Sequence, residues 1–333
     1  MRILILGGTG NISLGMVPVF LKEGHEVVLI NRGSKKVKGA VNLVCDRRNY
    51  AEFEALVAGL GTFDCVYDMI GFSLEDAKSD IRAFGGRTKQ FVFCSTVDVY
   101  QKPAPFYPVK ESTPKKADKR FEYSYYKLEM EKLLEAAAAE GRFELTIVRP
   151  AATYCDESAP IGIYNNGYAV LRRIREGKPI LVLGDGMSLW TFSHRDDVGA
   201  AIARAAGNEK TYGKAYHVCG DKAIPWISYY RTLAKAMGVK EVEFVHIPTD
   251  VLFAAEPADC SWCEFVFQYD NIYDTTAAKT DLGYKTTITW EEGAKKMTAR
   301  AEKAGHISSS TDSQYYDFYI NTAIEWKKFL RSR

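Results

Sequence analysis

Short apolar runs alternate with stretches of helical spacing over the first 150 residues of the chain. The run at 2–6 is apolar and is ended by glycine, as buried parallel strands are. Further strands are expected at 25–31, 41–45, 63–69, 90–94 and 144–149. Helices are expected at 14–23, 49–59, 73–84 and 121–140. This alternation predicts an α/β fold, a Rossmann-type doubly wound parallel sheet with helices on both faces.

The pattern becomes irregular after Pro150, which suits a second domain built partly of loops. A length of 333 residues agrees with about two domains. We expect a dinucleotide-binding Rossmann domain at 1–153 plus 191–221, and a smaller C-terminal α/β substrate-binding domain at 154–190 plus 222–333. The serine-rich stretch at 308–313 is expected to be a linker before a last helix at 315–330.

Composition narrows the functional classes. A net charge of +2 gives no broad field that would attract nucleic acid. The cysteines number 7, an odd count that does not suit a disulfide framework, and the pair Cys260 and Cys263 lacks further ligands, so no metal site is expected. No signal peptide is recognisable and no apolar run reaches the roughly 20 residues of a membrane helix. We therefore expect a cytoplasmic protein with no membrane partner.

A glycine-rich turn follows the first strand and opens a helix. Gly7 permits the tight turn, and Gly10 lets the backbone approach a pyrophosphate beside Asn11 and Ile12, the first residues of the helix. Ser13 takes the place where a third glycine is usual. This context predicts dinucleotide binding, and the alternative is a tight strand–helix turn without a ligand.

The residues after the second and third strands bear on the choice of cofactor. The second strand ends at Asn31 and Arg32, where NAD enzymes carry an acid for the ribose 2′-hydroxyl. Arg32 would instead suit a 2′-phosphate, so NADP is favoured over NAD, although such a basic cluster can also be plain solvated surface. Asp46, after the third strand, is a candidate partner for the adenine amino group.

Tyr123 and Lys127 lie four residues apart in the helix expected at 121–140, so their side chains leave the same face. An ammonium there stabilises a phenolate and brings the tyrosine pKa, about 10 in water, closer to working pH. A solvated helix face is the alternative for this common pattern. The pair gains weight from Thr96 and from the glycine turn, which precede it in order.

Several ordered motifs resemble the extended short-chain dehydrogenase/reductase superfamily, the group of nucleotide-sugar epimerases and dehydratases. They lie at 95–100, 123–127, 148–151, 184–186, 192–198, 274–284 and 290–293, over most of the chain. The resemblance implies an NAD(P)-dependent enzyme that transfers hydride reversibly at a carbinol carbon of a sugar-like, nucleotide-sugar or related substrate. The outcome would be epimerisation, dehydration or reduction.

The same resemblance implies roles for single residues. Tyr123 would be the general acid/base, and Lys127 would hold the nicotinamide ribose while lowering the pKa of the tyrosine. Thr96 would hydrogen-bond the substrate oxygen, or alternatively only cap the end of its strand. Asp98 stands where dehydratases of the superfamily place a carboxylate, and a carboxylate that merely faces water is the alternative.

Some features depart from the nucleotide-sugar enzymes. Trp190 stands where they usually have an arginine for the substrate phosphates, and it could stack on a base or sugar or fill the domain interface. The segments at 63–71 and 31–33 are similar to a branch that includes the chloroplast stem-loop RNA-binding proteins. The alternative function is therefore an RNA-binding or regulatory protein with a vestigial site. A homodimer is expected from the superfamily alone.

Overall fold

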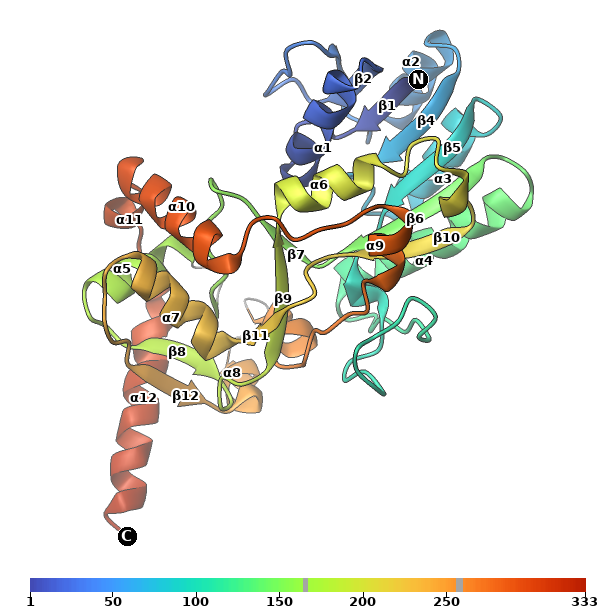
Figure 1. The fold of residues 1–333 in the computed structure, drawn as a ribbon. Helices are drawn as coiled ribbons and strands as arrows, with labels where there is room; N and C mark the ends of the chain where they lie inside the picture. The colour runs from blue at the N-terminus through green and yellow to red at the C-terminus, as the bar shows by residue number, and fades with distance from the viewer. Residues whose placement is uncertain (164–166, 256–259) are drawn as a thin grey trace. The chain divides into compact units, whose positions relative to one another are not determined.

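The computed structural model describes residues 1–163, 167–255 and 260–333. The chain divides into two compact units (Figure 1). Unit 1 consists of Met1–Thr153, Phe192–Asp221 and Tyr273–Thr287, and unit 2 of Tyr154–Thr191, Lys222–Ile272 and Ile288–Arg333. The domains expected from the sequence differ chiefly at Tyr273–Thr287, which we had placed in the substrate domain and which packs within unit 1.

A seven-stranded sheet forms the centre of unit 1. Its strands are β1 (Arg2–Leu6), β2 (Glu26–Asn31), β3 (Val41–Val44), β4 (Phe63–Asp68), β5 (Thr88–Cys94), β6 (Glu144–Pro150) and β10 (Lys214–Val218). They pair in the order β10-β6-β5-β4-β1-β2-β3, and every pair is parallel. The sequence predicts the parallel sheet and six of its strands, whose bounds differ from those expected by only a few residues, whereas β10 was not predicted as a strand of its own.

Helices cover both faces of this sheet. They are α1 (Asn11–Lys22), α2 (Tyr50–Gly59), α3 (Leu74–Phe84), α4 (Glu122–Ala139), α6 (Arg195–Ala203) and α9 (Thr276–Asp281). One buried core contains Phe20 of α1 and Ile202 of α6, and the other contains Phe53 of α2 and Leu134 of α4. Two separate cores, one on each side of the strands, confirm the doubly wound architecture.

Two glycines let α1 and α6 approach closely (Figure 1). A Cβ atom added to Gly15 would lie 2.4 Å from the backbone oxygen of Arg195. A Cβ atom added to Gly199 would lie 2.5 Å from the carbonyl carbon of Gly15. Backbone therefore packs on backbone at this crossing, and it holds the helix that follows the glycine-rich turn against the rest of unit 1.

Unit 2 is smaller and mixed. Its elements are α5 (Gly167–Arg175), β8 (Ile180–Leu183), β11 (Ala223–Pro225), α7 (Trp226–Ala236), β12 (Phe244–Ile247), α8 (Thr249–Ala255), a π-helical turn (Cys263–Phe267), α10 (Trp290–Lys303), α11 (His306–Ser309) and α12 (Gln314–Arg331). Strands β8 and β12 pair in parallel. Two further strands, β7 (Ala152–Tyr154) and β9 (Leu189–His194), run across the boundaries between the units, and the unit 2 part of β9 pairs with β11.

Aromatic packing forms much of the interior of unit 2. Trp190 stacks on Trp226 with ring centroids 5.1 Å apart and meets Phe267 edge-on at 5.1 Å. With 5% of its surface exposed, Trp190 is a core residue of this unit. It therefore packs inside unit 2 against Trp226 and Phe267.

The stretch expected to be a linker is more ordered than predicted. Its first residues belong to α11, and Asp312 accepts hydrogen bonds from Arg172 at 3.2 Å and Arg173 at 3.0 Å. Serine-rich composition suggested a solvated segment, but the two arginines of α5 fix it to the body of unit 2. In the part of the chain that the structure describes, no helix is long and apolar enough to span a membrane.

Candidate functional site

The predicted site residues of unit 1 gather at one edge of the parallel sheet. Parallel strands bring their carboxyl ends to the same edge, and there β1 is followed by the glycine turn and β5 by Thr96. Strand β1 lies between β4 and β2. From β1 the chain runs outward to β2 and β3 on one side, and it then crosses to β4 on the other side of β1. Ligands of open α/β sheets bind at such a switch point, outside the carboxyl ends of the strands.

The glycine turn has the tight geometry that the sequence predicted. Gly7 has a φ of 80°, a left-handed conformation that favours glycine, and its N–H donates to the backbone oxygen of Ile30 at 3.0 Å. A Cβ atom at Gly7 would lie 2.3 Å from Cγ2 of Ile70. The N–H of Gly10 closes the turn on the oxygen of Gly7 at 3.0 Å. Neither glycine can be replaced without a shift of its surroundings or a strained backbone.

Polar groups around this turn fit a dinucleotide. Helix α1 begins after Gly10, which has no side chain to accept from the first N–H groups of the helix. Among the described residues, Ser13 Oγ and Asn31 Nδ2 are buried without a hydrogen-bond partner. Uncapped N–H groups at the start of a helix favour an anion, and buried donors without partners indicate a missing acceptor. The residues present thus suit the pyrophosphate of NAD or NADP.

The other predicted cofactor residues lie around the same edge, with different partners. Asn11 donates through Nδ2 to the backbone oxygen of Thr153 at 2.9 Å, and Ile12 is half-buried in the first turn of α1. The side-chain oxygen of Asn31 accepts from the N–H of Thr9 at 3.3 Å, which ties the end of β2 to the glycine turn. Arg32 is exposed directly after this strand.

Asp46 is less available than the sequence suggested. Its carboxylate accepts from the backbone N–H of Arg48 at 3.0 Å and from the Arg48 side chain at 3.1 Å. The hydrogen bonds from Arg48 lower the pKa of Asp46 from its ordinary value. The carboxylate stays ionised and keeps lone pairs for an adenine amino group, but Arg48 fixes its orientation.

Thr96 and Asp98 form a small polar network at the end of β5. Thr96 precedes a short 3₁₀ helix, η1 (Val97–Val99), and its Oγ1 accepts from the N–H of Asp98 at 3.2 Å. Thr96 Oγ1 also donates to Asp98 Oδ2 at 3.1 Å, and Lys102 donates to Asp98 Oδ1 at 2.9 Å. With 10% of its side chain exposed, Asp98 does not simply face water. Thr96 caps a turn, as its alternative role required, and also faces the site.

Tyr123 stands beside this network. It lies in the first turn of α4, where Thr96 and Asp98 both affect the pKa of its phenol. Burial and the nearby negative charge of Asp98 raise the pKa of Tyr123, and the Thr96 side chain opposes them only in part. The expected lowering by Lys127 stays a prediction, while burial and Asp98 act on the phenol in the opposite direction.

Lys127 lies one turn further along α4 and is 2% exposed. Its ammonium donates to the backbone oxygen of Cys94 at 2.6 Å. The ring centroids of Phe72 and Phe93 lie 4.6 and 4.9 Å from Nζ. Burial lowers the pKa of Lys127, while Cys94 and Asp68 oppose this shift. The structure thus brings the lysine to the same edge as Tyr123, with its charge turned toward the end of β5.

One structural role in this region was missed by the sequence analysis. Arg149, at the end of β6, forms two hydrogen bonds with Glu131 of α4, at 2.8 and 2.7 Å, and a third with the phenol of Tyr100 at 2.6 Å. Tyr100 follows η1, so this buried arginine joins the helix of Tyr123 to the turn of Asp98. Arg149 at the end of an apolar strand was a signal of a buried ion pair, but its partners could not be identified from the sequence.

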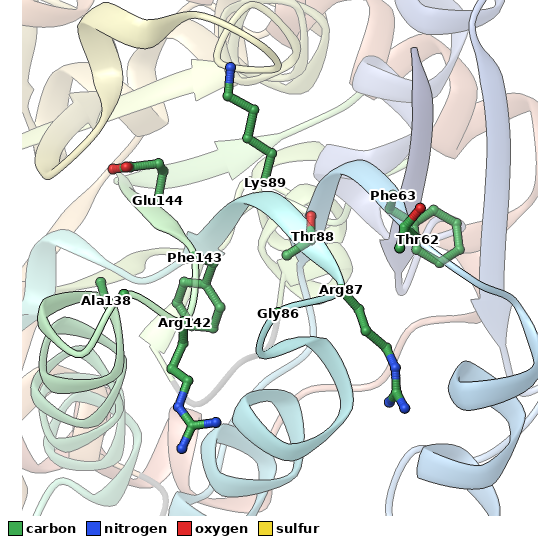
Figure 2. A pocket seen from close by; sticks show the side chains of 11 residues that line it. Thr62, Phe63, Gly86, Arg87, Thr88, Lys89, Ala138, Arg142, Phe143 and Glu144 are labelled. Atoms are coloured by element: carbon green, nitrogen blue, oxygen red, sulfur yellow. The ribbon is translucent and has the colours of Figure 1, made fainter.

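A cavity of about 440 Å³ also lies in unit 1, at the opposite edge of the sheet (Figure 2). It is lined by the first residues of three strands, Phe63, Thr88 and Glu144. Figure 2 shows Arg87 and Arg142 extending on either side of Gly86, while Lys89 points the other way. The cavity contains none of the predicted site residues, so the carboxyl edge remains the candidate site.

Comparison with known proteins agrees with this geometry. The model of the NAD dependent epimerase/dehydratase family matches residues 81–219, which include the ends of β5 and β6 and all of α4. The chain is 28% identical over 312 residues to the chloroplast stem-loop binding protein of 41 kDa b from Arabidopsis thaliana, covering 88% of this chain and 77% of the relative. It is also 28% identical over 278 residues to 2′-dehydrokanamycin reductase from Streptomyces kanamyceticus, covering 82% and 77%.

Solved structures of similar fold include sugar-nucleotide epimerases. UDP-glucose 4-epimerase from Thermotoga maritima superposes with a TM-score of 0.71 at 21% identity, covering 91% of this chain and 99% of that one. UDP-glucuronic acid 4-epimerase from Bacillus cereus, in complex with UDP-glucuronic acid and NAD, superposes with a TM-score of 0.71 at 18% identity, covering 91% and 100%. These similarities confirm the predicted Rossmann-type fold.

Proposed function

We propose that the chain is an NAD-dependent enzyme of the NAD dependent epimerase/dehydratase family, whose model matches residues 81–219, and that it reduces a ketone of a sugar-like substrate reversibly. The observation that carries this proposal is the phenol of Tyr123, which lies near Thr96 and Asp98 and one helical turn before the buried Lys127. Such a phenol can exchange a proton with a substrate oxygen.

The chain's own residues manage the proton and the orientation of the substrate. Thr96 and Tyr123 would both hydrogen-bond the substrate oxygen, and Tyr123 would donate its proton as the carbonyl becomes a hydroxyl. A nicotinamide cofactor, when bound, supplies the hydride that this reduction needs. The raised pKa of Tyr123, caused by burial and Asp98, keeps the phenol protonated at neutral pH and suits the donation of a proton.

Elimination of water fits the site less well. A dehydratase needs a carboxylate free to take the proton next to the transient ketone, and Asp98 is the candidate. Both of its oxygens are engaged, one by Lys102 and one by Thr96. Val97 also stands where acid–base pairs of the superfamily have a second acid. We therefore favour hydride transfer without elimination, as in reduction or epimerisation.

The cofactor would be held by the glycine turn and the strand ends. Gly7, Gly10, Asn11 and Ile12 would surround the pyrophosphate, and Lys127 the nicotinamide ribose. Arg32 would bind a 2′-phosphate, since the described residues include no ion pair of Arg32 with a carboxylate. We propose NADP over NAD on this ground.

A direct assay tests the proposal. Purified protein is mixed with NADPH and a panel of keto-sugars and keto-aminosugars, and loss of nicotinamide absorbance is followed. Tyr123→Phe should lower the rate about 10²- to 10⁴-fold, the usual contribution of a positioned acid, and should leave cofactor affinity unchanged. Tyr126→Phe, on the same helix, is the matched control and should keep the rate. Equal rates for both variants would contradict the assignment of Tyr123.

RNA binding is the second candidate, because one relative is named a chloroplast stem-loop binding protein. Basic residues such as Lys115 and Arg120 could contact RNA phosphates, but both are paired with carboxylates of the same chain. Lys115 pairs with Glu131 and Glu135 at 2.9 Å each, and Arg120 pairs with Asp118 at 2.9 Å. Binding of an RNA hairpin that weakens steeply with salt and is unaffected by Tyr123→Phe would favour this alternative.

A homodimer through α3 and α4 remains a prediction that accompanies the proposed enzyme. Sedimentation velocity of the purified chain over a range of concentrations tests it, and a single monomeric species at every concentration would contradict it.

A further inference from the structure

A buried cluster of charged side chains lies beside the candidate site and takes no part in the proposed reaction. Arg47 is 4% exposed, and Asp68 and Asp80 are fully buried. The guanidinium lies 2.8 Å from an oxygen of each of these aspartates. Buried charges are costly unless they are paired, so a cluster built from a loop, a strand and a helix needs a reason beyond packing.

Asp68 lies next to the surroundings of Lys127. It is the last residue of β4, and in the register of the sheet it is paired with Phe93 of β5. The Lys127 ammonium lies over that same phenylalanine at 4.9 Å and donates to the following residue, Cys94. Asp68 and the ammonium of Lys127 thus both lie beside Phe93 of β5.

Gly71 shows how closely the parts fit. A Cβ atom there would lie 2.2 Å from Oδ2 of Asp68 and 2.6 Å from the terminal carbon of Met130. Met130 follows Lys127 by three residues on α4 and faces the same way. Gly71 therefore lies between the Asp68 carboxylate and Met130, on the face of α4 that also carries Lys127.

Arg47 also holds the loop that covers Lys127. Its guanidinium donates to the backbone oxygen of Asp76 at 2.9 Å. The Asp76 carboxylate accepts from the N–H groups of Phe72 at 2.9 Å and Ser73 at 3.0 Å. The ring of Phe72 lies 4.6 Å from Lys127 Nζ. One arginine thus fixes both the carboxylate at the end of β4 and the aromatic ring over the ammonium.

We propose that Arg47 and Asp68 are positioning residues for Lys127: Asp68 supplies the buried negative charge opposite the ammonium, and Arg47 holds Asp68 and the Phe72 loop in place. The inference rests on the proposed function in one respect, that Lys127 is the lysine of the site. Together, Arg47 and Asp68 would keep the almost fully buried Lys127 charged and directed toward the cofactor ribose.

The charges around Lys127 support this assignment. Burial alone would raise the pKa of Asp68, but Arg47 and Lys127 hold it below its ordinary value. Burial and the neighbouring charge of Asp68 raise the pKa of Asp80 well above its ordinary value, which favours its protonated form. The titratable groups facing the ammonium are thus Cys94 on β5, Asp68 on β4, Asp76 on α3, and Arg47. Burial raises the Cys94 pKa to about 11, so Asp68 and Asp76 are the anions among them.

Two isosteric variants of the same cluster separate a charge effect from a structural one. Asp68→Asn removes the proposed counter-charge and keeps the side chain's shape. Asp80→Asn, equally buried, replaces a group whose protonated, neutral form is favoured. The readout is the titration of Lys127 in protein with carbon-13-labelled lysine, assigned by comparison with Lys127→Arg, together with NADPH affinity measured by fluorescence.

We expect Asp68→Asn to lower the Lys127 pKa by about one unit or more, the usual effect of removing an opposite charge at close range, and to weaken NADPH binding at alkaline pH. Asp80→Asn should change neither. Equal shifts in both variants, or none in Asp68→Asn, would overturn the proposal. The titration needs no cofactor, so absence of NADPH binding with the expected pKa shift would contradict the proposed function and leave this inference standing.

A double variant covers the case in which Asp68→Asn does not fold. Combined with Lys127→Met, the substitution no longer strands a buried ammonium, so the double variant should resist urea better than Asp68→Asn alone. A double variant that is no more stable than the single one would show that Lys127 is not the partner of Asp68.

Discussion

The ammonium of Lys127 lies 2.6 Å from the backbone oxygen of Cys94, at the end of the strand that leads to Thr96. The lysine is therefore anchored to the sheet, whereas burial and the charge of Asp98 raise the pKa of Tyr123. The Thr96 side chain acts on that pKa in the opposite direction. Cys94 therefore fixes the lysine, whereas Thr96 and Asp98 determine the environment of the tyrosine, so the two groups can be tested separately.

The hydroxyl of Thr96 should set the pH dependence of turnover. This side chain opposes the effects of burial and Asp98 on the pKa of Tyr123, so Thr96→Val should raise the pKa of the phenol further. Oxidation of an alcohol needs the phenolate, whose fraction increases with pH, so the rising limb of that profile should move to higher pH. Thr96→Ser, which keeps the hydroxyl, should retain the wild-type profile. The rate of alcohol oxidation between pH 7 and 11 measures this, and overlapping profiles for all three proteins would contradict it.

Arg32 should decide between the two nicotinamide cofactors. Charge-assisted hydrogen bonds contribute about 1.5–3 kcal/mol, so Arg32→Ala should raise the NADPH dissociation constant about 10- to 100-fold. NADH, which has no 2′-phosphate, should bind equally well to both proteins. Lys36→Ala removes an exposed charge from the same segment and serves as the control. Equal losses for NADPH in both variants would mean that only the general positive charge matters.

The contact between α1 and α6 should be intolerant of a single methyl group. At Gly15 a Cβ atom would lie 2.4 Å from the backbone oxygen of Arg195, so Gly15→Ala must separate two helices. We expect a loss of about 1–3 kcal/mol or more in the free energy of unfolding, measured in urea. Gly59, in α2, has nothing within 4 Å of the same position. Gly59→Ala should be neutral or stabilise by about 0.5–1 kcal/mol, and a similar loss in both variants would contradict the close contact.

The proton on Asp80 should be visible in the pH dependence of stability. Burial and Asp68 raise the Asp80 pKa in the folded chain, whereas the unfolded chain loses this proton above about pH 4. The contribution of this proton to the stability of the wild-type protein is therefore fully present below about pH 4, and it is lost as the pH rises through the folded-state pKa of Asp80.

Asparagine has no such proton to lose. The free energy of unfolding of Asp80→Asn should therefore increase relative to wild type, by up to about 1.4 kcal/mol per pH unit above pH 4. Urea unfolding at pH 5, 6, 7 and 8 gives the difference directly. A difference that does not change with pH would show that Asp80 is ionised in the folded chain.

The sequence predicted the features that local patterns determine. Alternating strands and helices and the turn at Gly7 are written in neighbouring residues, so the parallel sheet and its carboxyl edge could be expected. The environment of Tyr123 could not, because it depends on how η1 turns Asp98 toward the phenol.

The role of Arg47 was equally hidden. It stands in a charged run after β3 that suggests solvated surface, while its partners come from β4 and α3. A partial signal was present in those partners. Asp68 ends an apolar strand, and Asp76 and Asp80 lie four residues apart on the helical face that also carries the buried Ala77 and Ala83.

Titration with nicotinamide cofactors decides whether the carboxyl edge of the parallel sheet binds a dinucleotide. Purified wild-type protein, first checked for retained nucleotide, is titrated with NADPH and then NADH while nicotinamide fluorescence is followed. We predict saturable binding of both, with NADPH tighter, and displacement of NADPH by NADP⁺. A folded protein that binds neither cofactor and retains none would contradict the account of the site at the carboxyl edge of the sheet.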